Sequence, residues 1–423
     1  MRQTADHTRT SVRPSGARPR TRAAHRAMDW KKFTFDYHLD ATGLFSDLIA
    51  IEAYKEAAIN LVLPPDWRFQ LDRLNRVRAV YGTTVLEGNS LSEAEVSQQM
   101  DIAESPEEAA KRKATKEQQQ IRNAGRGQNW VKSRFSPDHA PLSIPDVLQM
   151  HRLITAGSDE DHNTPGAFRT FAVSVGSPDF GGVHNCAPHE RVSQLMDEYV
   201  TFVNSRKMAD SHPVVRALLA HFFLLTIHPF GDGNGRVSRL VEAGILFHGG
   251  YNVLGFYGLS NYFYRHEAEY KTLLQECRKI QPFDVTPFIK FGLKGFAQEL
   301  KGINNFIKAK LNRIVYRNTL FRAYNQKASE RRRAINQREY SLLEYLLVST
   351  EPVDPFSENP SRQIRFSELR GSPYVTASYK NVTARTFSRE LTRLADLHFI
   401  KLTKSDGQEE PIVELDFGAI GRY

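Results

Sequence analysis

The chain has little cysteine and no long hydrophobic run. Cys186 and Cys277 are its only cysteines among 423 residues, which excludes a disulfide scaffold or a cysteine zinc cluster and favours a reducing cytoplasm. No stretch reaches the ~18 consecutive apolar residues that a membrane helix needs, so we predict neither a membrane helix nor a membrane partner. Because 40% of the residues are hydrophobic, the chain can still bury enough core for about two domains.

The positive charge of the chain, +9 in total, is concentrated in two segments. Residues 1–27 hold seven Arg and one Asp, lack apolar periodicity and are predicted to be disordered. They would suit a nucleic-acid arm or a targeting segment, but we favour a start at Met28, since the folded pattern begins at Asp29. Residues 301–340 hold eleven Lys or Arg and two Glu. Such a basic helix is usually a solvated face, with nucleic-acid contact as the alternative.

The most informative segment is a glycine-rich loop at residues 228–239, with the sequence HPFGDGNGRVSR. Residues 213–227 before it are apolar on nearly every side, which is typical of a buried helix. Pro229 disfavours helical dihedrals at the preceding residue, so this helix should end at His228. The glycines allow a close approach of backbone to ligand. The helical pattern resumes from Arg236, and unpaired N–H groups at a helix start suit a phosphate.

The side chains of this loop suit a nucleotide triphosphate. His228 is the only group there with an ordinary pKa near neutrality, which makes it the natural general base. Asp232 can hold Mg²⁺ against phosphate oxygens. Arg236 and Arg239 lie three positions apart and can clamp further phosphates. The alternative is a glycine turn with solvated charges, but it does not explain so many suitable residues in one run.

The run resembles the signature of the Fic/Doc family, HxFx(D/E)GNGRxxR, at every specified position. This family transfers AMP from ATP to a hydroxyl side chain of a target protein and releases pyrophosphate. The resemblance implies that His228 deprotonates the target hydroxyl and that Asp232 binds Mg²⁺. It assigns nucleotide contacts to Gly231, Gly233, Asn234, Gly235, Arg236 and Arg239. A helix expected at 143–154, with Ser143 as its N-cap, is similar to the early helix of the family core.

Two further features resemble parts of the family site. A turn at 165–169 precedes alternating Phe171, Val173 and Val175, a pattern that resembles the hairpin flap on which a target segment docks. An ordinary surface hairpin is the alternative. Tyr262 and Tyr270 occupy positions where the family lines its adenine pocket. Many members have two adjacent tyrosines there, whereas this chain has Glu269 before Tyr270, so core packing is an equal alternative for these rings.

Residues 83–88 resemble the family's inhibitory motif, (S/T)xxxE(G/N), with Thr83 and Glu87 at its two fixed side-chain positions and Gly88 at its last position. The resemblance implies that Glu87 pairs with Arg239, displaces the γ-phosphate and inhibits the enzyme, because a carboxylate competes with phosphate for an arginine. The position of the motif, before the core, is similar to the subgroup with an N-terminal intramolecular inhibitor. A simple helix end is the alternative. In some relatives the same glutamate helps water to remove AMP, so the reverse activity stays open.

Residues 336–423 have the pattern of a winged helix. Helices are expected at 340–347, 366–369 and 383–397, followed by strands at 399–402 and 411–415. Arginines recur every four residues on the third helix, at Arg385, Arg389 and Arg393. Such a helix could enter a DNA major groove, but winged helices also serve in dimerisation or target docking. DNA and a second copy of the chain therefore both stay open as partners.

We therefore expect a mainly α protein with a Fic-type helical core, a β-hairpin flap and a C-terminal winged-helix (α+β) domain. The expected parts are a basic tail 1–27, a helical region with the inhibitory motif 28–130, the catalytic core 131–300, a basic linker helix 301–335 and the winged helix 336–423. The expected reaction is transfer of AMP from ATP, with Mg²⁺, to a Ser, Thr or Tyr hydroxyl of a target protein or of the chain itself. The alternatives are de-AMPylation, transfer of another phosphate group, and an ATP-sensing DNA-binding regulator.

Overall fold

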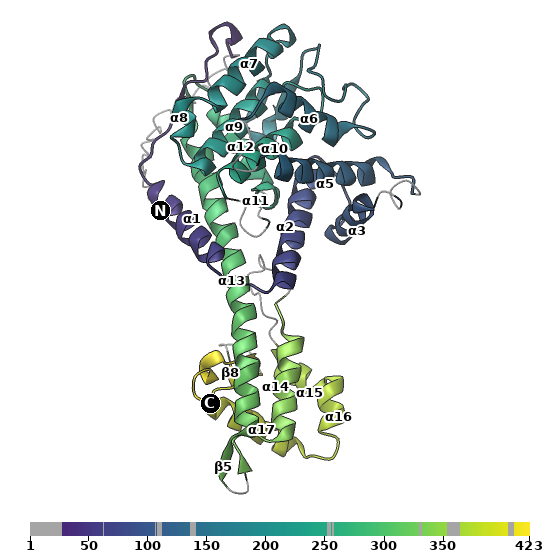
Figure 1. Ribbon diagram of the computed structural model, residues 1–423, viewed down its shortest axis with the longest axis vertical. Helices are drawn as coiled ribbons and strands as arrows, with labels where there is room; N and C mark the ends of the chain where they lie inside the picture. The colour runs from purple at the N-terminus through teal and green to yellow at the C-terminus, as the bar shows by residue number, and fades with distance from the viewer. Residues whose placement is uncertain are drawn as a thin grey trace, which may run out of the picture.

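The protein is mainly helical, as expected. Its described residues form two large hydrophobic cores. The core of the upper body runs in sequence from Trp30 to Ile307, and that of the lower body from Tyr316 to Ala419. The computed structural model describes residues 28–61, 63–105, 107, 112–135, 141–251, 255, 258–329, 332–352, 364–404 and 410–423. The tail at 1–27 lies outside this part of the chain. One long helix, α13 (Thr286–Asn325), runs from the upper body into the lower one (Figure 1). None of the described helices combines the length and the apolar character needed to cross a membrane.

Among the described residues, four α-helices precede α6 (Ile144–Thr155). They are α1 (Phe45–Ile59), α2 (Pro65–Val85), α3 (Glu93–Glu104) and α5 (Lys116–Arg134). Both α3 and α5 begin with a capping box, in which the side chains of the cap and of the third helical residue each bind the other's backbone N–H. A small separate cluster that includes Val80, Val96 and Ile121 packs α2, α3 and α5 together. This packing holds α2 beside the core.

The central element of the upper body is α9 (Pro213–Ile227). Its sequence is apolar on nearly every side, which predicted a buried helix, and thirteen of its fifteen residues are buried. It packs against α10 (Asn234–His248), which begins two residues earlier than the pattern indicated. The predicted cap at Ser143 is present and forms a capping box with Asp146. The other helices of this body are α6 (Ile144–Thr155), α7 (Val192–Val203), α8 (Arg206–Ala209), α11 (Ser260–Arg265) and α12 (Glu267–Cys277).

The expected flap is a hairpin that begins later than predicted. Strand β2 (Ser174–Ser177) pairs antiparallel with β3 (Gly182–Asn185). Val173 precedes β2, but its carbonyl still accepts from the Cys186 N–H across the hairpin at 3.1 Å. Phe171 lies outside the ladder, so the prediction of one alternating strand through Phe171, Val173 and Val175 is wrong at Phe171. The cause is a buried upstream arginine, described below, which binds the Phe171 carbonyl and keeps it out of the ladder. A second pair, β1 (Tyr37–His38) with β4 (Phe283–Asp284), is parallel.

The expected linker helix at 301–335 is instead the second half of α13. This helix begins fifteen residues before position 301, because its first half belongs to the upper core and no proline follows Pro287 within it. The buried residues of that first half include Phe288, Phe291, Leu293, Phe296 and Leu300. After α13 the chain forms two short strands, β5 (Lys327–Ser329) and β6 (Arg332–Arg333), rather than more helix.

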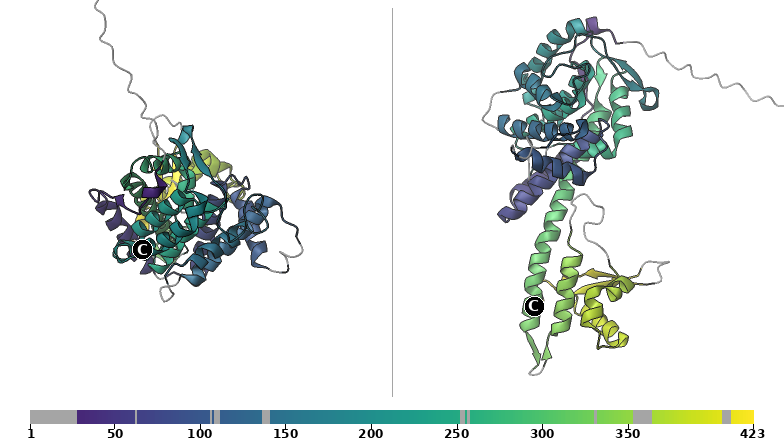
Figure 2. Two further views of the ribbon diagram at one scale, coloured as in Figure 1. Left: turned by 90° about the horizontal axis from the view of Figure 1, so that it is seen from above. Right: turned by 90° about the vertical axis from the view of Figure 1, so that its right-hand side faces the viewer.

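The lower body packs beside the second half of α13 (Figure 2, right). Its helices are α14 (Gln337–Ser349), α15 (Phe366–Gly371), α16 (Pro373–Ser378) and α17 (Ala384–Asp396). Its strands are β7 (Ile364–Arg365), β8 (Ile400–Thr403) and β9 (Ile412–Leu415), in the antiparallel order β7-β9-β8. Helices α14, α15 and α17 and the two final strands lie where the sequence predicts them. Strand β7 and helix α16 were not anticipated.

Candidate active site

The signature loop joins α9 to α10 through two residues in the left-handed region. His228 ends α9 with φ 56°, and its N–H donates to the Leu224 carbonyl at 2.9 Å. A non-glycine residue is uncommon in this region, but Pro229 excludes the right-handed alternative. Gly233, with φ 80°, then precedes α10. The Asn234 side chain closes the loop, because it accepts from the Phe230 N–H and donates to the Phe230 carbonyl, both at 2.9 Å.

Phe230 anchors the loop in the core. Its ring is fully buried and stacks on His151, with ring centroids 3.8 Å apart. The two nitrogens of His151 face the Asp232 carbonyl at 3.2 Å and the Gly166 N–H at 2.9 Å. Burial lowers the pKa of His151 to about 4, so its ring is neutral. These contacts with His151 hold the loop against α6.

Arg169 ties the flap to the signature loop. Its guanidinium is buried and donates to the carbonyls of His228 at 2.7 Å, Phe171 at 2.6 Å and Ala187 at 2.5 Å. The first of these bonds satisfies the carbonyl of the residue that ends α9, which has no partner within the helix. The sequence reasoning missed this role, although Arg169 lies within the segment assigned to the flap turn.

A cavity of about 370 Å³ opens beside the loop. It brings together six of the predicted site residues, namely Glu87, Val175, His228, Gly235, Arg239 and Tyr270. Unpredicted lining residues include Ser177, Phe180, Lys271, Gln275 and Arg278. Five predicted loop residues are not among those that line it: Gly231, Asp232, Gly233, Asn234 and Arg236. Gly231 has a packing role, since a Cβ there would lie 2.5 Å from the His162 carbonyl oxygen.

The proposed base, His228, is neutral. Burial, followed by the positive charge of Arg278, lowers the pKa of His228 to about 4. At neutral pH its ring can therefore accept a proton. Arg278 itself is 9% exposed, lies at the end of α12 and donates from Nε to the Thr226 hydroxyl at 3.2 Å. It forms no ion pair with a carboxylate in the described part of the chain. No spacing or neighbouring pattern in the sequence distinguishes it.

Arg239 is bound by the end of α2. Its Nη2 lies 2.6 Å from Glu87 Oε1, and its Nε donates to the Thr83 hydroxyl at 2.6 Å. Burial would raise the pKa of Glu87, but the charges of Arg239 and Arg236 outweigh it and lower that pKa, so Glu87 is ionised. The close approach requires Gly235, since a Cβ there would collide with Glu87 Oε1. Both fixed positions of the motif, 83 and 87, therefore bind one arginine.

Arg236 is directed to two carboxylates. Its Nη1 lies 2.7 Å from Asp159 Oδ2, and its Nη2 lies 3.0 Å from Asp232 Oδ1. The Asp159 side chain is 1% exposed, whereas that of Asp232 is 50% exposed. Sequence reasoning missed Asp159, which lies 77 residues from its partner. Among the described residues no group of three or more His, Cys, Asp or Glu is placed to hold a metal ion.

The two tyrosines expected in the adenine pocket have different surroundings. The Tyr270 hydroxyl lies 2.9 Å from His221 Nε2, and His221 Nδ1 lies 2.8 Å from the buried Glu242 carboxylate. This network fixes the Tyr270 ring in the cavity wall. Tyr262 does not line the cavity: its ring lies 5.0 Å from that of Phe291 and packs on α13. For Tyr262 the alternative of core packing therefore applies.

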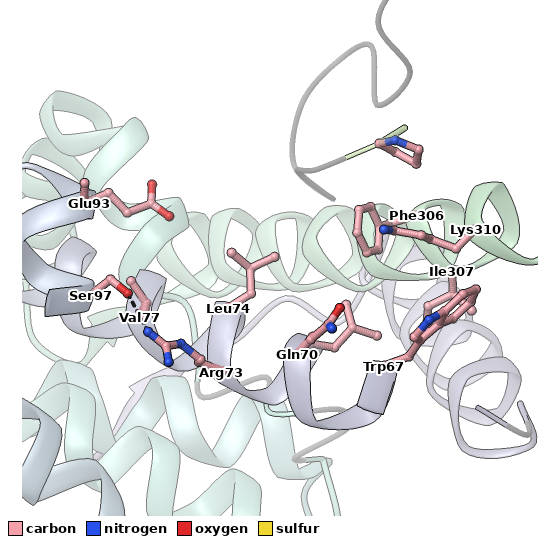
Figure 3. A pocket seen from close by; sticks show the side chains of 13 residues that line it. Trp67, Gln70, Arg73, Leu74, Val77, Glu93, Ser97, Phe306, Ile307 and Lys310 are labelled. Atoms are coloured by element: carbon pink, nitrogen blue, oxygen red, sulfur yellow. Dashed lines mark hydrogen bonds between the residues drawn. The ribbon is translucent and has the colours of Figure 1, made fainter. Parts of the chain in front are cut away.

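A second hollow, of about 600 Å³, lies between α2, α3 and α13 (Figure 3). Its wall is largely apolar, and the polar side chains at its rim bind other residues of the same chain. Arg73 donates to the Ser97 hydroxyl at 3.0 Å, and Lys310 lies 2.6 Å from Glu351. None of the signature residues lines it. The predicted site residues therefore gather at the smaller cavity and not at this one.

Comparison with known proteins agrees with this geometry. Residues 141–246 match the Fic/DOC family, and this segment contains α6, both flap strands and the whole signature loop. Residues 141–246 are a Fic domain. Within it lie His228, Asp232 and both signature arginines, whereas Glu87 and Arg278 lie outside the matched segment.

Two curated relatives extend the similarity. The chain is 27% identical over 215 residues to protein adenylyltransferase Fic of Aedes aegypti, covering 51% of this chain and 39% of that protein. It is 34% identical over 173 residues to a protein adenylyltransferase of Caenorhabditis briggsae, covering 41% of this chain and 32% of that protein. The chain thus spans about a third to two fifths of the length of these relatives.

Solved structures show the same fold. A Fic family protein from Desulfovibrio desulfuricans superposes with a TM-score of 0.51 at 18% identity, covering 90% of this chain and 98% of that chain. A Fic domain containing signaling protein from Bacteroides thetaiotaomicron has a TM-score of 0.51 at 20% identity, covering 61% and 95%. At these identities the likeness concerns the fold alone.

Proposed function

We propose that the protein is an adenylyltransferase that moves AMP from ATP to a Ser, Thr or Tyr hydroxyl of a target protein and of itself. The observation that carries this proposal is the cavity in which a neutral His228 and Arg239 meet beside the start of α10. The names of the two curated relatives support the same reaction.

In this reaction the target hydroxyl oxygen attacks the α-phosphorus of ATP. The new P–O bond forms as the bond to the β-phosphate breaks, and pyrophosphate leaves. His228 accepts the hydroxyl proton, as its neutral ring allows. The backbone N–H groups at the start of α10 face the transferred phosphate, and Arg239 neutralises the outer phosphates. Positioning and neutralisation of charge do most of the work in such transfers.

The residues present fit a Mg²⁺ ion bound together with the nucleotide. Asp232 is half exposed, and its described hydrogen bonds both go to Oδ1. Mg²⁺ prefers one or two carboxylates together with substrate phosphates, so a cluster of protein ligands is not needed. When bound, the ion would neutralise phosphate charge. Arg236, held by Asp159, would keep the Asp232 carboxylate oriented.

Glu87 would inhibit this reaction. Its carboxylate lies on Arg239 and against Gly235, where an outer phosphate would otherwise bind. The second fixed residue, Thr83, binds the same guanidinium through its hydroxyl. ATP would bind productively only after the Glu87 side chain leaves Arg239.

Incorporation of label from α-³²P-ATP with Mg²⁺ tests the proposal. We expect strong self-labelling in Glu87→Gly, weak labelling in the wild type and none in Glu87→Gly/His228→Ala. Label from γ-³²P-ATP in place of the α-label would show transfer of another phosphate group. Absence of both labels, with a range of target proteins present, would refute the transferase proposal.

A further inference from the structure

Helix α17 presents a polar face to solvent that is basic over its first two turns. Its exposed residues Arg385, Ser388, Arg389 and Thr392 recur at positions i, i+3, i+4 and i+7, so they form one stripe. The opposite face carries Phe387, Leu391 and Leu394, all buried in the lower core. The helix therefore presents a stripe of two guanidinium and two hydroxyl groups, in which the Thr392 hydroxyl donates to the Ser388 carbonyl at 3.1 Å.

The one exposed acid of α17, Asp396, lies in its last turn, beyond the two arginines. Glu390, the only acid of α17 before Asp396, is 6% exposed and points inward, where it binds Arg338 and the Tyr379 hydroxyl. The third arginine that the sequence placed on the stripe, Arg393, is engaged by the buried Glu339. This contact corrects the expected stripe of three arginines to two.

The two remaining arginines are free to bind a ligand. Among the described residues neither Arg385 nor Arg389 forms an ion pair. Further exposed basic groups flank α17 on both sides along the chain: Lys380 precedes it, and Lys404 follows at the end of β8, which packs beside α17. Lys380 and Lys404 thus add to the positive charge of Arg385 and Arg389, whereas β9 carries Glu414 and Lys401 of β8 is paired with Asp416 at 3.5 Å.

We propose that α17 binds duplex DNA by entering its major groove. An α-helix fits this groove, which is about 12 Å wide, and Arg, Ser and Thr are side chains that bind phosphates and base edges. A protein partner fits less well, because protein interfaces are centred on buried apolar or aromatic anchors and the stripe has none. Duplex RNA fits less well too, because its major groove is deep and narrow.

Fluorescence anisotropy of the full chain with a labelled mixed-sequence DNA duplex, from low to moderate salt, tests this inference. We compare the wild type with Arg385→Gln/Arg389→Gln and with the matched control Lys31→Gln/Lys32→Gln, which removes two exposed charges from the upper body. Loss of two phosphate contacts should lower the slope of log K against log salt by about 2 and weaken binding at 0.1 M salt by about 50-fold. The control should bind like the wild type.

The design separates α17 from the rest of the chain. The arginine-rich residues 1–27 attract DNA equally in all three proteins, so the difference in slope reports α17 alone. Matching thermal unfolding midpoints establish that both variants are folded. Equal slopes for the wild type and the α17 variant, an absence of binding even at low salt, or tighter binding of a duplex RNA of the same sequence would each overturn the inference. Unchanged DNA binding by His228→Ala is expected, because the site is remote from catalysis.

Discussion

Replacement of Glu87 by glycine should activate the enzyme. The ion pair with Arg239 measures 2.6 Å, and the two side chains are 30% and 4% exposed. Separating a fully buried pair costs about 3–5 kcal/mol. Because almost a third of the Glu87 side chain is accessible, solvent offsets part of that cost, and we expect about 2–3 kcal/mol here. At subsaturating ATP this corresponds to roughly a 30- to 150-fold rise in the rate of α-label incorporation.

Two variants control this experiment. Glu87→Gln keeps the shape of the side chain but removes its charge, so its rate should lie between those of the wild type and Glu87→Gly. Glu56→Gln removes an exposed carboxylate from α1 and should leave the rate unchanged. If Glu87→Gly binds ATP as tightly as expected but labels no faster than the wild type, the contact with Arg239 does not limit turnover and the reasoning is wrong.

Three further predictions follow from the site. Burial lowers the pKa of His151, His184 and His228 to about 4, 3 and 4, so these rings bind protons only when the chain unfolds. The contribution of these histidines to the free energy of unfolding is then fully present above pH ~6.5 and falls by up to about 1.4 kcal/mol per histidine per pH unit below it. The urea midpoint should therefore drop from pH 7.5 to pH 5.5, a range in which most carboxylates hardly titrate. A constant midpoint would contradict this prediction. In a Glu87→Gly background, Arg278→Met should lower kcat/KM for ATP at least ~10-fold, because a cation leaves the cavity. The unfolding midpoint should stay the same, and a large fall in it would instead indicate a structural role. Asp232→Asn should raise the Mg²⁺ concentration for half-maximal labelling about 10-fold or more, and an unchanged Mg²⁺ dependence would remove Asp232 from the metal site.

The signature loop could be predicted from the sequence because its constraints are local. Apolar residues on all sides of 213–227 require burial, and Pro229 fixes where the helix ends. The pairing of Glu87 with Arg239 spans 152 residues, and only the resemblance to a family motif connected them. The prediction agrees with the observed contact, because the Thr83 hydroxyl and the Glu87 carboxylate, at the two fixed positions of that motif, both accept from the Arg239 guanidinium.

The features that the sequence did not reveal depend on tertiary contacts. Arg169 and Arg278 are single basic residues without a periodic pattern, and only the packing of distant elements gives them their partners. Tyr262 and Tyr270 are eight positions apart on α11 and α12, and only the bend between these helices directs one ring to the core and the other to the cavity. The predicted start of the linker helix at position 301 was wrong, because it was placed where the charge of the sequence changes, and a change in charge does not interrupt a helix.

The structure also restricts how inhibition can be relieved. Helix α2 packs tightly on α11, since a Cβ on Gly82 would lie 2.7 Å from the Ser260 carbonyl oxygen. The segment after α2 differs: Gly88 has φ 87°, and a Cβ there would meet nothing within 4 Å. Thr83 can therefore keep its hold on Arg239 while the turn that carries Glu87 changes conformation. If Glu87 inhibits as proposed, its release would then require a change in this turn rather than a shift of α2.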